Sequence, residues 1–302
     1  MQIILAFLAC VLIWGSTWYA IELQLGVVPK EWSVVYRFVI ASGVLFLVCF
    51  FRKEKLKVAA RDHIWVAGTG LFLFSGTYIL TYTGAEFLTS GLVAISFSLL
   101  SFLNIVNGRL FLGNRIQGSS LLAALIGVAG LIFVFKPEID AFSLTDTSLQ
   151  GLIYCLLATV VCSLGNTLAG APKSQSIPLF TFNAYALGYG ALFNTLYALS
   201  TGSTPALDMQ FSYVGSLIYL SIVGTVIAFS IYLWLIDQIG IGRAAYMSVM
   251  TPVVALSIST FMEGFIWTSE AIAGVSFVVF GNLLMLKLKN RPKTSKPVKE
   301  TN

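Results

Sequence analysis

The sequence predicts an all-α polytopic membrane protein with ten transmembrane helices, arranged as two inverted five-helix repeats. Three observations support this fold class. The 302-residue chain is 57% hydrophobic and only 10% charged, whereas soluble domains carry about 25% charged residues. The apolar residues form long, unbroken segments of the length that a bilayer requires. Short motifs also recur in the two halves of the chain, as in Pro29 and Pro178, at a common spacing.

Ten segments have the length and composition of a spanning helix, which needs about 20 mostly apolar residues. Charged or proline-containing stretches separate most of them, such as Pro29-Lys30-Glu31 and Lys136-Pro137-Glu138. Lipid offers no hydrogen-bond partners, so the backbone must be paired within each segment, which favours helices. The strands of a membrane barrel would instead alternate apolar and polar residues. The expected spans lie near residues 2–22, 32–51, 63–83, 88–108, 117–136, 149–169, 178–200, 212–236, 243–263 and 268–288.

The basic residues predict the orientation, because Lys and Arg gather in cytoplasmic loops. With the N-terminus inside, nine Lys and Arg of the loops and six of the C-terminal tail lie on the cytoplasmic side, against Lys30 and Lys136 outside. We therefore expect a multi-pass protein of the cytoplasmic (inner) membrane with both termini cytoplasmic. The net charge of +5 follows from this bias and from a basic, disordered tail at 289–302 that lies against anionic lipid. No nucleic-acid partner is expected.

The internal repeat sets the domain organisation. Gly76-Thr77 matches Gly224-Thr225, and Gly130 of the fifth segment matches Gly281 of the tenth. Five helices is an odd number, so the two units would enter the membrane from opposite sides, and inverted repeats place a substrate site between the halves near the midplane. The alternative is that hydrophobic helices resemble one another by composition alone. We expect a first repeat at 1–136, an outer linker at 137–148 and a second repeat at 149–288.

Several motifs resemble those of a known transporter family. They are Ile13-Trp14-Gly15-Ser16-Thr17 in the first helix, Arg37-Phe38 in the second, Ala85-Glu86 and Ser90-Gly91 before the fourth, Thr251-Pro252-Val253 in the ninth, and Gly274 with Gly281 in the tenth. Together they resemble the EamA-type members of the drug/metabolite transporter superfamily. The resemblance covers residues 2–288. It implies ten helices, two inverted five-helix repeats, a central cavity, and transport of amino acids, other metabolites, drugs or vitamins such as riboflavin.

The chain departs from the family pattern at the ends of two helices. Gly113 is followed by Asn114, where the family often has a Gly-Glu pair, although the second repeat keeps the acid as Glu263. Leu100-Ser101 stands where the first repeat would match Pro252. The resemblance therefore does not imply symmetric roles for the acids.

Aromatic side chains with a few polar groups suit a cavity for small, partly apolar solutes. For each of these residues alone, lipid contact or ordinary helix contact is the competing interpretation. Pro252 frees one backbone carbonyl and would kink its helix, which serves either gating or shape. The cavity candidates are Trp14, Thr17, Trp18, Tyr78, Asn166, Tyr232 and Tyr246.

Ionisable residues within a membrane are costly and are therefore candidate functional groups. Arg37, about 7 Å into the second helix, would bind an anionic substrate group, snorkel to the interface or pair with an acid. Glu86 is the first candidate for proton or cation coupling, because a partly buried carboxylate can take up a proton near neutral pH. The alternatives for Glu86 are a solvated acid or a partner for Arg37. Glu22 is an equal candidate for that pairing.

No cofactor, metal site or enzymatic activity is expected. The four cysteines lie in apolar segments without metal-ligand spacing, and the single histidine, His63, forms no catalytic arrangement with the acids. No phosphate-binding Walker motif is present. We therefore expect a secondary active transporter of a small organic metabolite that works by alternating access. Amino-acid or related metabolite efflux is favoured, with proton coupling as an option and vitamin uptake as the alternative; a channel or structural membrane protein ranks lower.

A stripe of small residues raises the question of a partner chain. Ala123, Gly127 and Gly130 lie on one face of the fifth segment, and small residues let membrane helices approach closely. The stripe is consistent with contact inside the protein or with a homodimer. The other expected partners are the lipid bilayer and a small-molecule substrate.

Overall fold

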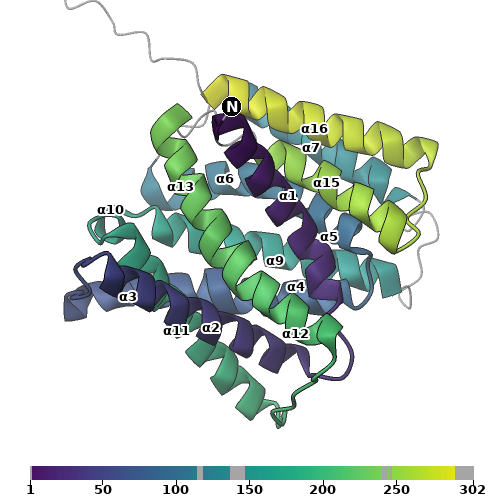
Figure 1. The fold of residues 1–302 in the computed structure, drawn as a ribbon. Helices are drawn as coiled ribbons and strands as arrows, with labels where there is room; N and C mark the ends of the chain where they lie inside the picture. The colour runs from purple at the N-terminus through teal and green to yellow at the C-terminus, as the bar shows by residue number, and fades with distance from the viewer. Residues whose placement is uncertain (1, 114–117, 137–146, 240–243, 245–246, 290–302) are drawn as a thin grey trace, which may run out of the picture.

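The protein is an assembly of helices (Figure 1). The computed structural model describes all residues except 1, 114–117, 137–146, 240–243, 245–246 and 290–302. The expected linker and tail therefore lie largely outside the described residues.

Within the described ranges every regular element is helical: α1 (Gln2–Glu22), α2 (Lys30–Phe51), η1 (Ala60–Asp62), α3 (His63–Thr69), η2 (Gly70–Gly76), α4 (Thr77–Ala85), α5 (Ser90–Ser96), η3 (Phe97–Leu99), α6 (Leu100–Leu112), α7 (Gly118–Val134), α9 (Thr147–Ala169), α10 (Pro172–Gln175), α11 (Leu179–Ser200), α12 (Phe211–Ile218), η4 (Tyr219–Ile227), α13 (Ala228–Ile239), α15 (Met247–Met262) and α16 (Ser269–Lys289).

Six helical stretches of the described chain are long and apolar enough to cross a bilayer. They are Gln2–Glu22, Lys30–Phe51, Ala60–Ala85, Ser90–Leu112, Thr147–Ala169 and Phe211–Tyr232. Three shorter apolar helices accompany them, at Leu125–Val134, Val249–Met262 and Ser269–Leu284. The span expected at 178–200 corresponds to α11, whose apolar sequence is interrupted by Asn183 and Asn194.

The outer surface of the helices is apolar, as a lipid solvent requires. Leu12, Leu157 and Leu196, each within its helix, are 57%, 48% and 54% exposed. Polar side chains instead lie inside, where they bond to helix carbonyls: Thr159 Oγ1 donates to the Cys155 carbonyl over 2.7 Å, and Asn194 Nδ2 to that of Phe74 over 3.0 Å. Buried polar groups need such partners. This inside-out arrangement is that of a multi-pass membrane protein.

Two pairs of helices that lie far apart in the sequence pack side by side, α2 with α11 and α7 with α16 (Figure 1). The close approach of α7 and α16 requires glycine. A Cβ atom at Gly274 of α16 would lie 2.6 Å from the carbonyl oxygen of Gly130 and 2.5 Å from Val134. In the structure the small-residue stripe of α7 thus contacts α16 of the same chain, with Ala123 and Gly127 beside Gly281.

The same local geometry recurs at both ends of α2 and α11. Their capping residues, Pro29 and Pro178, both have φ −53° and ψ 133°. Two residues after each helix end comes a left-handed residue, Lys53 at φ 53° after α2 and Gly202 at φ 71° after α11. The turns share their hydrogen bonds as well, because Glu54 N bonds to the Cys49 carbonyl and Ser203 N to the Ala198 carbonyl, both over 2.9 Å.

A second recurrence involves the π-helical segments η2 and η4. Thr77, the residue after η2, donates through Oγ1 to the Phe72 carbonyl, and Thr225 of η4 donates through Oγ1 to the Leu220 carbonyl; both bonds are 2.8 Å long and reach five residues back. π-helical turns widen a helix locally and are frequent at functional sites. Both segments contribute residues to the wall of an internal cavity, Leu73 and Phe74 from η2 and Gly224 and Thr225 from η4.

Candidate substrate cavity

A cavity of about 930 Å³ lies between the two halves of the chain. Residues of α1, α2, η2, α4 and α5 line it from the first half, and residues of α9, α11, η4, α13 and α15 from the second. Its volume is that of a site for a small organic molecule. Its lining includes the exposed residues Gln175 and Leu179 and the buried residues Ile21, Arg37 and Thr81.

The structure brings most of the sequence-predicted site residues to this cavity. Pro252 and Arg37 line it, and so do six of the seven cavity candidates: Trp14, Thr17, Trp18, Tyr78, Asn166 and Tyr232. Tyr246 lies outside the described residues. Sequence reasoning missed Phe97 and Phe229, which also line the wall. They follow no motif, and only the crossing of helices distinguishes them from the lipid-facing phenylalanines.

Aromatic contacts between the halves shape the middle of the cavity. The rings of Trp14 and Tyr232 meet edge to face at 5.2 Å between centroids, and Trp18 lies 5.0 Å from Phe97. Trp14 Nε1 donates to the carbonyl of Gly224 in η4 over 3.2 Å. Thr77 and Thr225 donate to carbonyls of their own helices, and most of the residues that line the wall are aromatic or aliphatic. Such a wall suits a solute with an apolar body.

Arg37 provides the one charge on the cavity wall within the described residues. It is 3% exposed, and its guanidinium carbon lies 4.8 Å from the ring centre of Tyr78. It also interacts with the phenol of Tyr82. Its Nε and Nη1 atoms have no hydrogen-bond partner. Throughout the described part of the chain, no carboxylate lies within ion-pair distance of this guanidinium.

The acids expected near Arg37 have other neighbours. Glu86 is 38% exposed and forms an ion pair with Lys30 at 2.8 Å. Glu22 is partly buried and its Oε2 has no hydrogen-bond partner, and it interacts electrostatically with Glu263. Lys30 begins α2, about two turns before Arg37, so Glu86 reaches Lys30 and leaves Arg37 deeper in the protein.

A contact between the halves joins the start of α5 to the residue that follows α15. Glu263, which follows α15, accepts a hydrogen bond from Ser90 N over 2.8 Å and a second one from Ser90 Oγ. Ser90 begins α5, where a helix has unpaired N–H groups and favours a carboxylate. Sequence reasoning placed Glu263 at a helix end without a partner, since nothing in the sequence indicates which helix start it meets.

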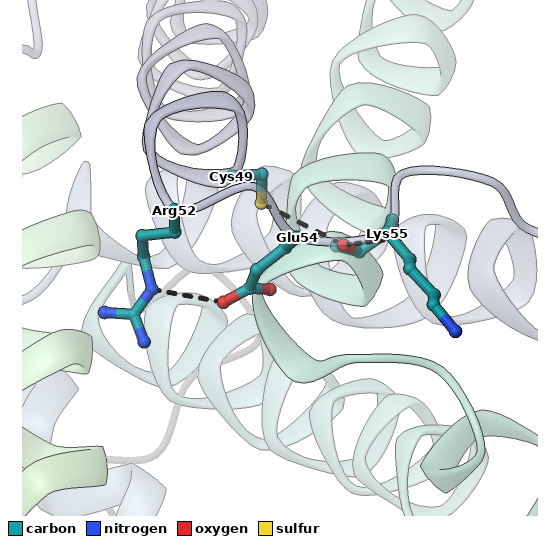
Figure 2. A network of polar contacts seen from close by, with 5 residues as sticks. Cys49, Arg52, Glu54 and Lys55 are labelled. Atoms are coloured by element: carbon teal, nitrogen blue, oxygen red, sulfur yellow. Dashed lines mark hydrogen bonds and ion pairs between the residues drawn. The ribbon is translucent and has the colours of Figure 1, made fainter.

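The opposite end of α2 carries a cluster of polar and charged residues (Figure 2). Arg52 Nε lies 3.2 Å from Glu54 Oε1. Thr181 Oγ1 of α11 donates to the carbonyl of Lys55 over 3.1 Å. The second contact attaches the loop after α2 to the first turn of α11, which also contributes Leu179 to the cavity wall.

Comparison with known proteins identifies a consistent set of relatives. The sequence profile of the EamA-like transporter family matches residues 1–136 and 149–287. An uncharacterized transporter of Bacillus subtilis, YoaV, is 23% identical over 84% of this chain and 86% of its own length. A probable amino-acid metabolite efflux pump of Salmonella typhimurium is 21% identical, covering 91% of both chains. An inner membrane transporter of Escherichia coli K12, YedA, is 22% identical over 91% of this chain and 86% of its own length.

A solved crystal structure shares the fold. It superposes with a TM-score of 0.67 at 16% identity and covers 95% of this chain and 97% of that chain. The family and the names of these relatives indicate a transporter rather than an enzyme.

Proposed function

The chain belongs to the EamA-like transporter family, and we propose that it exports a small organic metabolite, an amino acid or a related compound, by secondary active transport. The observation that supports this is the cavity. It is lined by both halves of the chain, reaches the surface near Gln175, and ends beyond Arg37 where Ser90 and Glu263 join the halves. A site that opens at one end only is what alternating access requires.

We propose further that the fold consists of ten membrane helices in two inverted repeats. The matched caps at Pro29 and Pro178, 149 residues apart, and the matched bonds of Thr77 and Thr225, 148 residues apart, support this. The arrangement requires α7, α11, α15 and α16 to span the membrane beside the six stretches that are long and apolar enough. The units would be those expected from the sequence, 1–136 and 149–288.

The direction rests on charge. The cavity opens at the end that carries Arg52, Lys55 and Lys173, and basic loops stay in the cytoplasm. This state would therefore load substrate from the cytoplasm while its outer end is closed, with both chain termini in the cytoplasm. The Salmonella relative named as an amino-acid metabolite efflux pump supports both the direction and the substrate class.

Proton coupling would act at the closed end. Opening that end must break the contact of Glu263 with Ser90, and Glu22 lies close enough to interact with Glu263. Two neighbouring carboxylates repel each other when both are ionised, so a proton taken up by either changes the stability of the closure. The buried Oε2 atom of Glu22 has no hydrogen-bond partner, which supports Glu22 as the first candidate for the coupling residue. Glu86 is the second candidate, and its exposure and its pairing with Lys30 make it the weaker one.

The test is mass spectrometry of cell contents and medium, in cells that express the wild type, a blocked variant or an empty vector. Asn166→Trp fills the cavity, and Leu196→Trp places the same side chain on the lipid-facing surface, where Leu196 is 54% exposed. We expect one or more metabolites to move to the medium with the wild type and Leu196→Trp, but not with Asn166→Trp. Net uptake of an added vitamin such as riboflavin would reverse the proposed direction, and flux that neither saturates nor shows counterflow would indicate a channel.

A further inference from the structure

We propose that Arg37 is the binding site for a carboxylate of the transported solute at the closed end of the cavity. The inference rests on the transport function proposed above and narrows its substrate to compounds that combine one anionic group with an apolar body. The juxtaposition that supports it is a buried, unpaired guanidinium at the end of a cavity whose remaining wall is mainly aromatic and aliphatic.

The guanidinium lacks the partners that a buried cation needs. Arg37 is 3% exposed, and two of its three nitrogens, Nε and Nη1, have no hydrogen-bond partner. A buried charge without a counter-ion is strongly unfavourable, and buried charges in proteins are almost always paired. The planar guanidinium matches a carboxylate through two parallel hydrogen bonds. A carboxylate that enters the cavity would supply the missing acceptors.

The protein itself does not neutralise Arg37 within its described residues. Glu86 is held by Lys30 at 2.8 Å, and Glu263 by Ser90. Beside Arg37, the Tyr82 hydroxyl donates to Gln24 Oε1 over 2.7 Å, which leaves Gln24 Nε2 as a further buried donor without a partner. The hydrogen-bond donors of Arg37 and Gln24 that lack partners would be satisfied by a ligand that supplies acceptor atoms and a negative charge.

Aromatic rings fix the guanidinium and define where the rest of the solute lies. The rings of Tyr78 and Phe38 lie 4.8 Å and 5.5 Å from the Arg37 guanidinium carbon, and such cation–π contacts orient the group without neutralising its charge. Trp18 and Phe97 line the cavity on the way to its opening. A carboxylate on Arg37 would place an attached apolar body against these rings.

The experiment measures binding with matched pairs of probes. Each pair is a carboxylate and its neutral primary amide, which have almost the same shape: 3-phenylpropionate, indole-3-acetate, benzoate and isovalerate with their amides. Binding to the purified full-length protein in detergent is followed by the rise in melting temperature and, for the three pairs without an indole ring, by the change in tryptophan fluorescence, to which Trp14 and Trp18 of the cavity wall contribute. The variants are Arg37→Gln, Arg37→Lys and, as a matched control, Arg52→Gln, which removes an arginine that is paired with Glu54 outside the cavity wall (Figure 2).

We expect at least one acid to bind about tenfold or more tightly than its amide, as a charged hydrogen bond predicts. Arg37→Gln should abolish the preference, Arg37→Lys should keep part of it, and Arg52→Gln should leave it unchanged. If Arg37→Gln does not fold, Arg37→Lys provides the test, because lysine keeps the charge but lacks the planar guanidinium. A preference for the acid over its amide that is weaker in Arg37→Lys than in the wild type still supports the proposal. The proposal is overturned if no acid is preferred over its amide, or if the preference is the same in every Arg37 variant that folds.

Transport assays separate this proposal from the one it rests on. Proteoliposomes that move neutral or cationic solutes as readily as the acids would retain the transport function and overturn the carboxylate site. Proteoliposomes that move no solute, with an Arg37-dependent acid preference in the binding assay, would retain the site and overturn the transport function.

Discussion

Ser90 and Glu263 join the two halves of the chain through two hydrogen bonds to one carboxylate. Ser90 N donates to Glu263 Oε1 over 2.8 Å, and Ser90 Oγ donates to the second oxygen. In the proposed mechanism the pair closes one end of the cavity, so any movement that opens this end must separate the two residues. The contact is therefore a measurable link between structure and transport.

Glu263→Gln should make the closed end easier to open. The substitution replaces two charge-assisted hydrogen bonds by neutral ones, and hydrogen bonds to charged groups contribute about 1.5–3 kcal/mol each against about 1 kcal/mol for neutral ones. A reporter is Thr81→Cys at the end of the cavity, in a chain without native cysteines, labelled by an impermeant maleimide from the side of Lys30. We expect labelling several-fold faster than in the parent. Glu270→Gln, which alters an exposed acid bonded to Ser269, is the control, and equal rates in both variants would contradict the prediction.

Glu22→Gln should reduce the pH dependence of transport more than Glu86→Gln does. Glu22 interacts with Glu263 and has a buried oxygen without a partner, whereas Glu86 is exposed and paired with Lys30. Both variants remove one ionisable group with almost no change in shape. The measurement is solute flux in proteoliposomes with an imposed pH gradient, at verified equal protein. Loss of gradient response in Glu86→Gln alone would assign coupling to Glu86.

Gly274→Ala should destabilise the protein by separating α7 from α16. The new methyl group would lie within 2.6 Å of the Gly130 carbonyl oxygen and within 2.5 Å of Val134, and overpacking of this kind costs about 1–3 kcal/mol. Gly43→Ala in α2 is the control, because a Cβ there meets nothing within 4 Å and alanine favours a helix. Thermal unfolding in detergent should show a lower midpoint for Gly274→Ala and an unchanged or higher one for Gly43→Ala. An unfolding midpoint for Gly274→Ala at or above that of the parent would show that α16 does not contact α7 closely at Gly274.

Thr77→Val and Thr225→Val should destabilise the two π-helical segments equally. Each removes one hydroxyl bond of 2.8 Å to a carbonyl five residues back, which contributes about 1 kcal/mol. Because the threonines lie in different helices, we expect the double variant to show nearly the sum of the two effects. Melting midpoints of the four proteins are the measurement. A large effect at one site and none at the other would count against equivalent roles in two repeats.

Part of the site could be predicted from sequence because its residues are conspicuous in a membrane. Arg37, Trp14 and Asn166 stand out in apolar segments, where polar and amphipathic side chains are costly or specifically placed, and all three line the cavity. Their partners could not be predicted. Glu86 was expected to serve proton or cation coupling, to be a solvated acid or to pair with Arg37. In the structure it pairs with Lys30, and the sequence does not indicate which of two cations on the same helix the acid reaches.

The membrane as the surrounding solvent and the helical elements of this protein follow from its amino-acid sequence alone. Its apolar segments are long enough to span a bilayer. Because backbone N–H and C=O groups cannot stay unpaired in lipid, each segment forms a helix. Which of these similar helices lie side by side is visible only in the folded protein. Small residues such as Gly130 and Gly274 permit close contact, but hydrophobic segments can pair in many ways and periodicity does not choose among them. The cavity, its closure by Ser90 and Glu263, and the unpaired state of Arg37 all follow from that choice, because each arises from side chains that are far apart in the chain and adjacent only in the folded protein.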